Sequence, residues 1–126
     1  MEFVINLTTA EMAFPTDWCG VRSGKEYHKF EEMKLTPGKC TVVNAPLIEE
    51  SPLCIECRVK EIVSLGSHDM FIADVVNVRA DENHLNPETG KLELAEANPL
   101  VYVHGGYYEL GNRKVRMERR EEEITC

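Results

Sequence analysis

The sequence predicts a mainly β domain with two short helices, and three observations lead to this fold class. β-Branched and aromatic residues recur in short runs that are separated by Gly, Pro and Asn turns. Two segments each carry a helix-capping pattern beside apolar residues. The chain has 126 residues, enough for one hydrophobic core, with no internal repeat or linker. We therefore expect a single domain over residues 1–115 and a charged C-terminal tail over residues 116–126.

The first predicted elements are a strand and a short helix. EFVINL, residues 2–7, is the β-branched and aromatic run that favours a strand. Thr8 and Glu11 then form a T-x-x-E capping box, so a helix should begin at Thr9. Pro15 lacks an amide hydrogen and clashes with the preceding turn, so this helix should end, kink or restart there.

A second helix is predicted from a second capping box. Ser23 and Glu26 have the S-x-x-E spacing, which places the helix N-terminus at Ser23. Tyr27, Phe30 and Met33 follow at intervals of three and form one apolar stripe. The opposite face is charged.

The clearest β signal is a long hairpin. Residues 53–65, LCIECRVKEIVSL, alternate between apolar and polar positions, which places Glu56 on the polar face with Arg58 and Lys60. GSH then turns the chain into DMFIADVVNV, residues 69–78. Because this second strand is apolar on both faces, we expect a barrel wall that a partner covers.

Two further extended segments flank the hairpin. Residues 40–48, CTVVNAPLI, are β-rich, and Pro46 is typical of an edge or irregular strand. Residues 98–111, NPLVYVHGGYYELG, predict another strand and a bend at the glycines. The segment between the hairpin and this last strand is a polar excursion with an N-P-E-T-G turn.

Composition and charge exclude several classes of protein. The chain is 43% hydrophobic and 29% charged, as folded globular proteins are, and its net charge of −8 argues against nucleic-acid binding. No apolar run is long enough to cross a membrane, and MEFVINL lacks the basic leader and cleavage site of a signal peptide. Five cysteines, an odd number without a secretion signal, predict reduced thiols in the cytoplasm.

The C-I-E-C motif of Cys54 and Cys57 raises the question of a metal or disulfide site. On a strand, residues three positions apart point to opposite faces, so these thiols should not meet. No second C-x-x-C is present to complete a zinc site. We expect no metal.

Taken in order, five motifs resemble the flavin reductase-like family, the FMN-binding split barrel that includes flavoredoxins. The motifs are EFVINL, TDWCGVRSGKEYHKFEEMKLTP, APLIEESPLCIEC, LGSHDMFIADVVNV and NPLVYVHGGYYELG, and the likeness covers residues 2–111. The resemblance implies a Greek-key split β-barrel, a homodimer, and FMN bound near the dimer interface. It also implies electron transfer from NAD(P)H, or from a protein donor, through FMN to an acceptor.

Family members normally carry further strands before the equivalent of EFVINL. The resemblance therefore implies a barrel truncated at the N-terminus. An alternative function follows, that of a non-catalytic split-barrel module acting as a dimer or as a subunit of a larger complex.

The resemblance also implies roles for several residues. His68 matches the family's histidine near flavin and nicotinamide, where it could donate a hydrogen bond; alternatively it is a turn histidine that bonds to backbone. Trp18 either stacks on the flavin or anchors its loop in the core. Tyr107 and Tyr108, which follow HGG, wall either the isoalloxazine site or the dimer seam.

A phosphate site is expected at the second predicted helix. Helix N-termini attract phosphate through their free amides and dipole, and Ser23 would stand at this one. Lys25 and Lys29 lie one helical turn apart and would contact a phosphate of FMN or NAD(P)H. The alternative is a solvated charged face.

Overall fold

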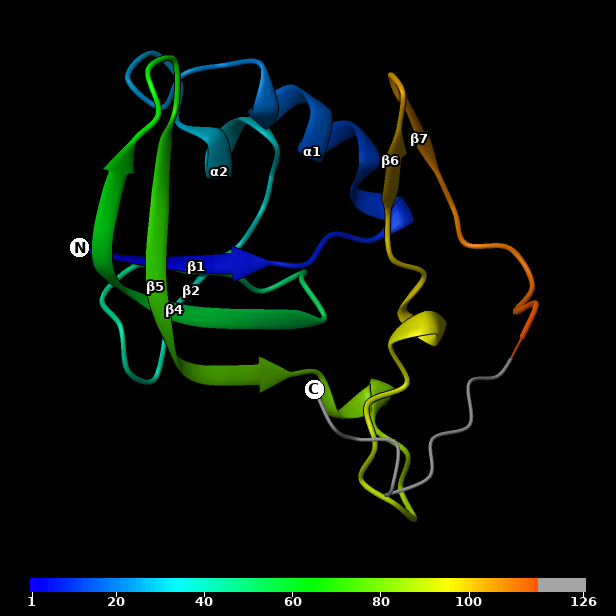
Figure 1. The fold of residues 1–126 in the computed structure, drawn as a ribbon. Helices are drawn as coiled ribbons and strands as arrows, with labels where there is room; N and C mark the ends of the chain where they lie inside the picture. Colours follow the sequence, from blue (N-terminus) through cyan, green and yellow to red (C-terminus); the bar gives the residue numbers. More distant parts are fainter. Residues whose placement is uncertain (116–126) are drawn as a thin grey trace.

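The computed structural model describes residues 1–115, and a three-stranded antiparallel sheet in the order β1–β4–β5 lies at its centre (Figure 1). Strand β1 (Glu2–Asn6) pairs with β4 (Leu53–Ser64), and β4 pairs with β5 (Asp69–Ala80). Strands β4 and β5 form the long hairpin that apolar–polar alternation and the GSH turn predict. The mainly β class with two short helices is confirmed, while the predicted tail lies outside the described residues.

The first helix differs from the prediction in its start. A 3-10 turn (Ala10–Met12) passes directly into α1 (Ala13–Gly20), and no side chain caps either element. The Thr8 capping box is therefore wrong; the Thr8 carbonyl instead accepts a hydrogen bond from the Leu100 amide at 3.0 Å. Pro15 lies in the first turn of α1, where no intrahelical donor is needed, and α1 continues through it; the change from the 3-10 turn to the α-helix comes at Ala13, so the helix neither ends nor restarts at Pro15.

The second capping box is also wrong, because no helix begins at Ser23. Helix α2 (Lys29–Glu32) starts six residues later and has four residues. The Ser23 hydroxyl oxygen accepts a hydrogen bond from the Lys25 amide at 3.2 Å, and the Ser23 carbonyl accepts from Glu26 and Tyr27. This local turn satisfies the backbone in a non-helical conformation, as serine side chains often do. Within residues 1–115, no helix has the length and apolar character that crossing a membrane requires.

Two small hairpins complete the described chain. Strands β2 (Pro37–Gly38) and β3 (Leu47–Ile48) pair with each other, as do β6 (Val101–Val103) and β7 (Gly106–Tyr108). Between β6 and β7, His104 and Gly105 have φ values of 45° and 83°, as a two-residue hairpin turn requires. Two short 3-10 turns, Glu82–His84 and Leu94–Ala97, lie in the polar excursion.

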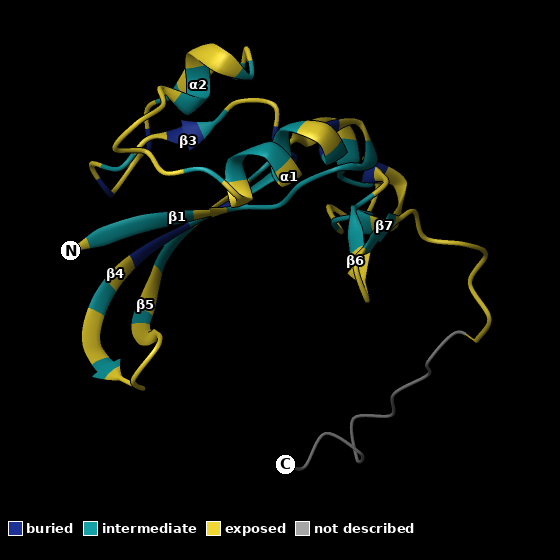
Figure 2. Cartoon of the chain, turned by 90° about the horizontal axis from the view of Figure 1, so that it is seen from above, coloured by how far each residue is buried: buried dark blue, intermediate teal, exposed yellow. Residues whose placement is uncertain are grey.

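The three sheets remain separate within residues 1–115, so the predicted Greek-key barrel closure is not seen there. Strand β5 has one neighbour in its sheet, and its second edge is free in the described chain. Its apolar side chains are largely exposed, with 47% of Phe71 and 60% of Val75 accessible. Figure 2 shows the same exposure toward the end of the β4–β5 hairpin. Covering of this strand by a partner stays a prediction.

The core is small and lies where β4 passes β1. Its buried cluster consists of Cys40, Val43, Leu47 and Cys54, and Val76 packs against it. These residues come from β3, β4, β5 and the loop before β3. Burial here therefore joins the loop 39–46 to the central sheet.

Glu56 is completely buried (0% exposed), although alternation places it on the polar face of β4. One carboxylate oxygen accepts hydrogen bonds from the Val42 and Val43 amides at 2.7 and 3.0 Å. The other accepts from Asn77 Nδ2 at 2.6 Å and from the Thr41 amide at 3.3 Å. The Asn77 bond is the main cause, ahead of the backbone bonds, that lowers the pKa of Glu56 from 4.5 to about 2 despite its desolvation.

Alternation fails at this point because both faces of β4 are covered. Glu56 shares its face with Cys54, which is 3% exposed and belongs to the buried cluster, and Cys57 on the opposite face is 2% exposed. The neighbouring strand β5 carries a bulge here: Glu56 pairs with Asn77 and Cys57 pairs with Val75, so Val76 is an extra residue of β5.

Replacing Glu56 should destabilise the fold strongly. Glu56→Ala leaves three backbone amides and the Asn77 amide without their acceptor, and we expect the melting temperature to fall by about 10 °C. Differential scanning calorimetry measures the melting temperature. Glu61→Ala, at an exposed position of the same strand, is the control and should stay within about 2 °C of wild type. Equal effects of the two variants would contradict the role of Glu56.

Acid should weaken the fold through the same carboxylate. The folded-state pKa of Glu56 is about 2 against an ordinary 4.5, so its contribution is complete above about pH 5 and is lost as the pH falls toward 2. Over that range, the free energy of unfolding should fall more steeply for wild type than for Glu56→Gln, as urea titrations at each pH would show. Parallel curves would rule out this linkage.

Candidate functional site

Three consecutive residues of α1 contact side chains that lie outside this helix. Asp17 Oδ1 accepts a hydrogen bond from the Tyr107 hydroxyl at 3.0 Å. The carbonyl of Cys19 accepts one from Lys29 Nζ at 2.6 Å. Trp18, between them, lies against Arg22. Helix α1 therefore brings together three of the predicted site residues, Trp18, Lys29 and Tyr107.

Trp18 is part of a stack with a cation. The Arg22 guanidinium carbon lies 4.4 Å from the centre of the Trp18 ring, and Arg22 Nη1 donates to the Trp18 carbonyl at 3.3 Å. The Tyr27 ring meets the indole edge-on, with centroids 5.4 Å apart and planes at 75°. Trp18 is half-buried. Its packing thus combines cation–π and aromatic contacts, and Arg22 covers part of one ring face.

The predicted helix-terminal phosphate site is wrong, because Ser23 lies in a turn and not at a helix N-terminus. Lys29 holds the carbonyl of Cys19, so its ammonium joins α2 to the end of α1. Lys25 is exposed, and within residues 1–115 its ammonium has no hydrogen-bond partner. Lys25 and Arg22 are therefore the cations that remain for an anion at this turn.

The tyrosines of the β6–β7 hairpin divide between its two faces. Tyr102 and Tyr107 are opposite in register, with ring centroids 5.4 Å apart in an edge-to-face contact. Tyr108 points to the other face, where its ring lies over Gly106; a Cβ at Gly106 would approach Tyr108 Cε2 to 3.0 Å. Desolvation, and then the bond to Asp17, raise the pKa of Tyr107, so its phenol keeps its proton and donates a hydrogen bond to Asp17.

His68 lies away from this group of residues. It occupies the turn between β4 and β5, where its carbonyl accepts from the Leu65 amide at 2.8 Å. Its Nδ1 lies 2.9 Å from the Ser67 hydroxyl oxygen, and the side chain is exposed. Figures 1 and 2 place this turn and the β6–β7 hairpin at opposite ends of the described chain. The structure therefore does not bring His68 together with Trp18, Lys29 or Tyr107 within one chain.

Two apolar cavities adjoin α1 and α2. One, of about 310 Å³, is lined by Thr8, Met12, Pro15, Thr16, Cys19, Gly20, Leu35 and Ile48. The other, of about 420 Å³, is lined by Gly24, Tyr27, His28, Lys29, Phe30, Glu31, Leu35 and Pro37. Cavities of this size and character are typical of sites for small, partly apolar molecules. Leu35 lines both, so they are adjacent.

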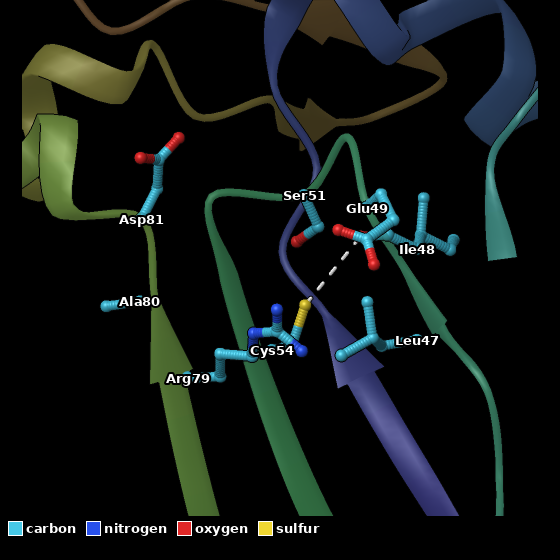
Figure 3. Close-up of a pocket in the computed structure, with 8 residues that line it drawn as sticks. All are labelled: Leu47, Ile48, Glu49, Ser51, Cys54, Arg79, Ala80 and Asp81. Carbon is cyan, nitrogen blue, oxygen red and sulfur yellow. Dashed lines mark hydrogen bonds between the residues drawn. The ribbon is translucent and has the colours of Figure 1, made fainter. Parts of the chain in front are cut away.

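A third cavity, of about 280 Å³, is polar and lies at the other end of the hairpin from His68 (Figure 3). Arg79, Glu49 and Asp81 give it both signs of charge, and the Cys54 thiol points into it and donates to the Ile48 carbonyl at 3.8 Å. None of the predicted site residues lines it. No three His, Cys, Asp or Glu side chains of residues 1–115 gather as a metal site.

Sequence reasoning missed Asp17 and the role of Arg22. Arg22 follows Trp18 by four residues, a spacing at which helical neighbours meet, so that contact could have been predicted. Asp17 and Tyr107 are 90 positions apart, and no local pattern connects them.

Comparison with known proteins gives a consistent result. A family model described as "Flavin reductase like domain" matches residues 1–111. The flavoredoxin of Desulfovibrio vulgaris (Miyazaki F) is 26% identical with a TM-score of 0.82, over 91% of this chain and 62% of that chain. The flavoredoxin from Methanosarcina acetivorans is 25% identical with a TM-score of 0.81, over 91% of this chain and 61% of that chain.

A curated relative agrees with these structures. The FMN reductase (NADH) RutF of Pseudomonas syringae pv. syringae is 37% identical over 69 residues, which are 55% of this chain and 32% of that protein. The chain thus spans less than two thirds of the length of each of the three proteins.

The cysteines should differ sharply in reactivity. Cys40, Cys54 and Cys57 are 7%, 3% and 2% exposed, and burial raises the pKa of the first two thiols, whereas Cys19 is half-buried. In the variant Cys126→Ser, which removes the thiol outside the described residues, we expect one thiol to react with a disulfide reagent at least about tenfold faster than the others. That fast phase should disappear on adding Cys19→Ser. Its persistence would show that a buried thiol is accessible.

Proposed function

The chain belongs to the flavin reductase-like family, and from this premise we propose that it binds FMN and transfers electrons from NAD(P)H, or from a protein donor, to an acceptor. The observation that carries the proposal is the family match across residues 1–111. The aromatic and apolar surroundings of α1 support it. We further propose that the protein works in the cytoplasm with its thiols reduced.

The residues around α1 fit the ring system of a flavin. The two adjacent apolar cavities provide concave apolar surface, and Trp18 and Tyr27 provide aromatic surface beside them. Bound FMN would supply the hydride and electron chemistry, while the protein supplies its binding and orientation. We assign the ring contacts to Trp18 and Tyr107, and we assign Tyr108, which points to the other face of the hairpin, to the dimer seam.

We propose that the turn after α1 contacts the phosphate of the cofactor. Within residues 1–115 the ammonium of Lys25 has no hydrogen-bond partner, and the guanidinium of Arg22 has further N–H donors besides the one that bonds to the Trp18 carbonyl. The Ser23 hydroxyl, which accepts from the Lys25 amide, can donate its own hydrogen. Lys29 contributes indirectly, because its bond to Cys19 fixes the turn that carries these groups.

His68 is proposed to contact the nicotinamide or acceptor side of the site. The Ser67 hydroxyl holds one ring nitrogen, which leaves the other to donate a hydrogen bond. Because His68 and Tyr107 lie at opposite ends of one chain, a shared site would need them from different subunits.

A homodimer is therefore part of the proposal. Strands β4 and β5 expose Ile62, Phe71 and Val75, and within residues 1–115 one edge of β5 has no neighbouring strand. A monomer would leave these apolar side chains in water, and exposed apolar surface often marks an interface. A second copy pairing there would cover both the apolar side chains and the open edge.

The open sheets also favour a second candidate function. Three sheets that do not close within residues 1–115 are compatible with a non-catalytic module that is completed by another chain. Such a module would act as a dimer or as a subunit of a larger complex, and it would not bind flavin.

Flavin binding tests the proposal directly. The protein purified without added cofactor should absorb near about 450 nm, as oxidised flavin does, or should take up FMN with quenching of Trp18 fluorescence. Lys25→Ala should weaken FMN binding about five- to tenfold, because it removes a charge-assisted phosphate contact.

His68→Ala should lower the NAD(P)H-dependent reductase rate at least about tenfold while leaving the fold intact.

Lys91→Ala, at an exposed position in the polar excursion, is the matched control for Lys25→Ala and should bind FMN as wild type does. A colourless protein that quenches neither flavin nor Trp18 fluorescence would reject flavin binding. In that case, a mass in solution equal to two copies, or to one copy with another chain, would support the module instead.

A further inference from the structure

The β6–β7 hairpin contacts the rest of the chain through few groups. Its strands have three residues each, and a two-stranded hairpin of this length is marginal on its own. Backbone bonds fix only its base, where the Leu100 amide donates to Thr8 and the Ala10 amide donates to Asn98, at 3.0 and 2.9 Å. Tyr102 is 65% exposed and Tyr108 is 58% exposed. The returning strand β7 therefore depends on side-chain contacts for its position.

One hydrogen bond joins β7 to α1. The Tyr107 hydroxyl donates to Asp17 Oδ1 at 3.0 Å, and within residues 1–115 no other side-chain hydrogen bond links these two elements. The second side-chain bond at this hairpin, from Asn98 Nδ2 to Glu109 Oε1, is 3.4 Å long and joins its two flanks to each other. Asp17 is thus the group that fixes Tyr107, and Tyr102 follows because its ring packs edge-to-face on Tyr107.

We propose that Asp17 is a positioning residue that latches the β6–β7 hairpin onto α1 through Tyr107 and thereby holds Tyr107 and Tyr102 in place against this helix. The assignment of these tyrosines to a ligand site rests on the proposed function, whereas the latch itself does not. A charged acceptor suits this role, because hydrogen bonds to ionised groups are stronger than neutral ones. The raised pKa of Tyr107 is consistent with a phenol that remains a donor.

Hydrogen exchange tests the latch in the protein without any ligand. Tyr107→Phe removes one oxygen atom, and Asp17→Ala removes its acceptor, so each should speed exchange of the β6–β7 amides about fivefold, the effect of one net hydrogen bond. The amides of the β4–β5 hairpin should exchange as in wild type. The double variant should show no further increase, because both changes break the same bond.

Two variants separate positioning from general destabilisation. Asp17→Asn keeps a carbonyl acceptor for the Tyr107 hydroxyl and should restore exchange close to the wild-type rate. Glu109→Ala removes the other side-chain bond of this hairpin and should leave β6–β7 exchange nearly unchanged. The near-ultraviolet circular dichroism of the Tyr102–Tyr107 pair should diminish in Tyr107→Phe and Asp17→Ala, but not in Asp17→Asn.

The outcomes decide the latch and the proposed function separately. Unchanged β6–β7 exchange in both single variants, additive effects in the double variant, or equal acceleration throughout the chain would each overturn the latch. If wild type binds FMN, Asp17→Ala should raise the dissociation constant about fivefold and Asp17→Asn should restore it. If wild type binds no FMN, the proposed function fails, and the exchange measurements still decide whether Asp17 positions the hairpin.

Discussion

The buried carboxylate of Glu56 is the interaction on which the arrangement of the core depends. It lies on the central strand of the only three-stranded sheet in the described residues, and it gathers the amides of Thr41, Val42 and Val43 around one charge. The loop that these amides belong to carries Cys40 and Val43 into the apolar cluster. An irregular segment with few backbone partners of its own is thereby held against a regular sheet. Asn77 on β5 completes the acceptor set, so a single side chain joins loop, central strand and edge strand.

Local chemistry explains which parts of this fold the sequence could predict. The β4–β5 hairpin follows from alternation and a glycine turn, because both signals act between near neighbours. The prediction of a helix at Ser23 is wrong, because the hydroxyl that could cap a helix instead accepts a hydrogen bond from the Lys25 amide and closes a turn. Alternation places Glu56 on the solvent face because it does not reveal that the loop 39–46 covers this face of β4. Its burial depends on amides from a loop 13 to 15 positions earlier.

Some members of the candidate site are predictable from the sequence, whereas Asp17 and the contacts that connect the members are not. The motifs indicate Trp18, Lys29 and Tyr107. In the structure Trp18 belongs to α1, and the side chains of Lys29 and Tyr107 donate hydrogen bonds to this helix. What joins them is the set of contacts made by consecutive positions of one helix, which only the tertiary fold reveals. The same motifs indicate His68, but the β4–β5 turn that carries it lies on the opposite side of the molecule from the β6–β7 hairpin. The proposed site therefore draws on two subunits. Sequence motifs thus indicate candidate residues without indicating whether these residues lie side by side in one subunit.

The bulge at Val76 of β5 has a consequence for how this domain tolerates length changes. Because successive side chains of a strand alternate between faces, loss or gain of one residue here exchanges the inner and outer positions of the neighbouring stretch of β5. Natural variation in length should therefore accumulate in the polar excursion after β5 and avoid this stretch. Lineages of this domain are free to diverge in side chains along β5, yet the count of residues between its two ends is constrained.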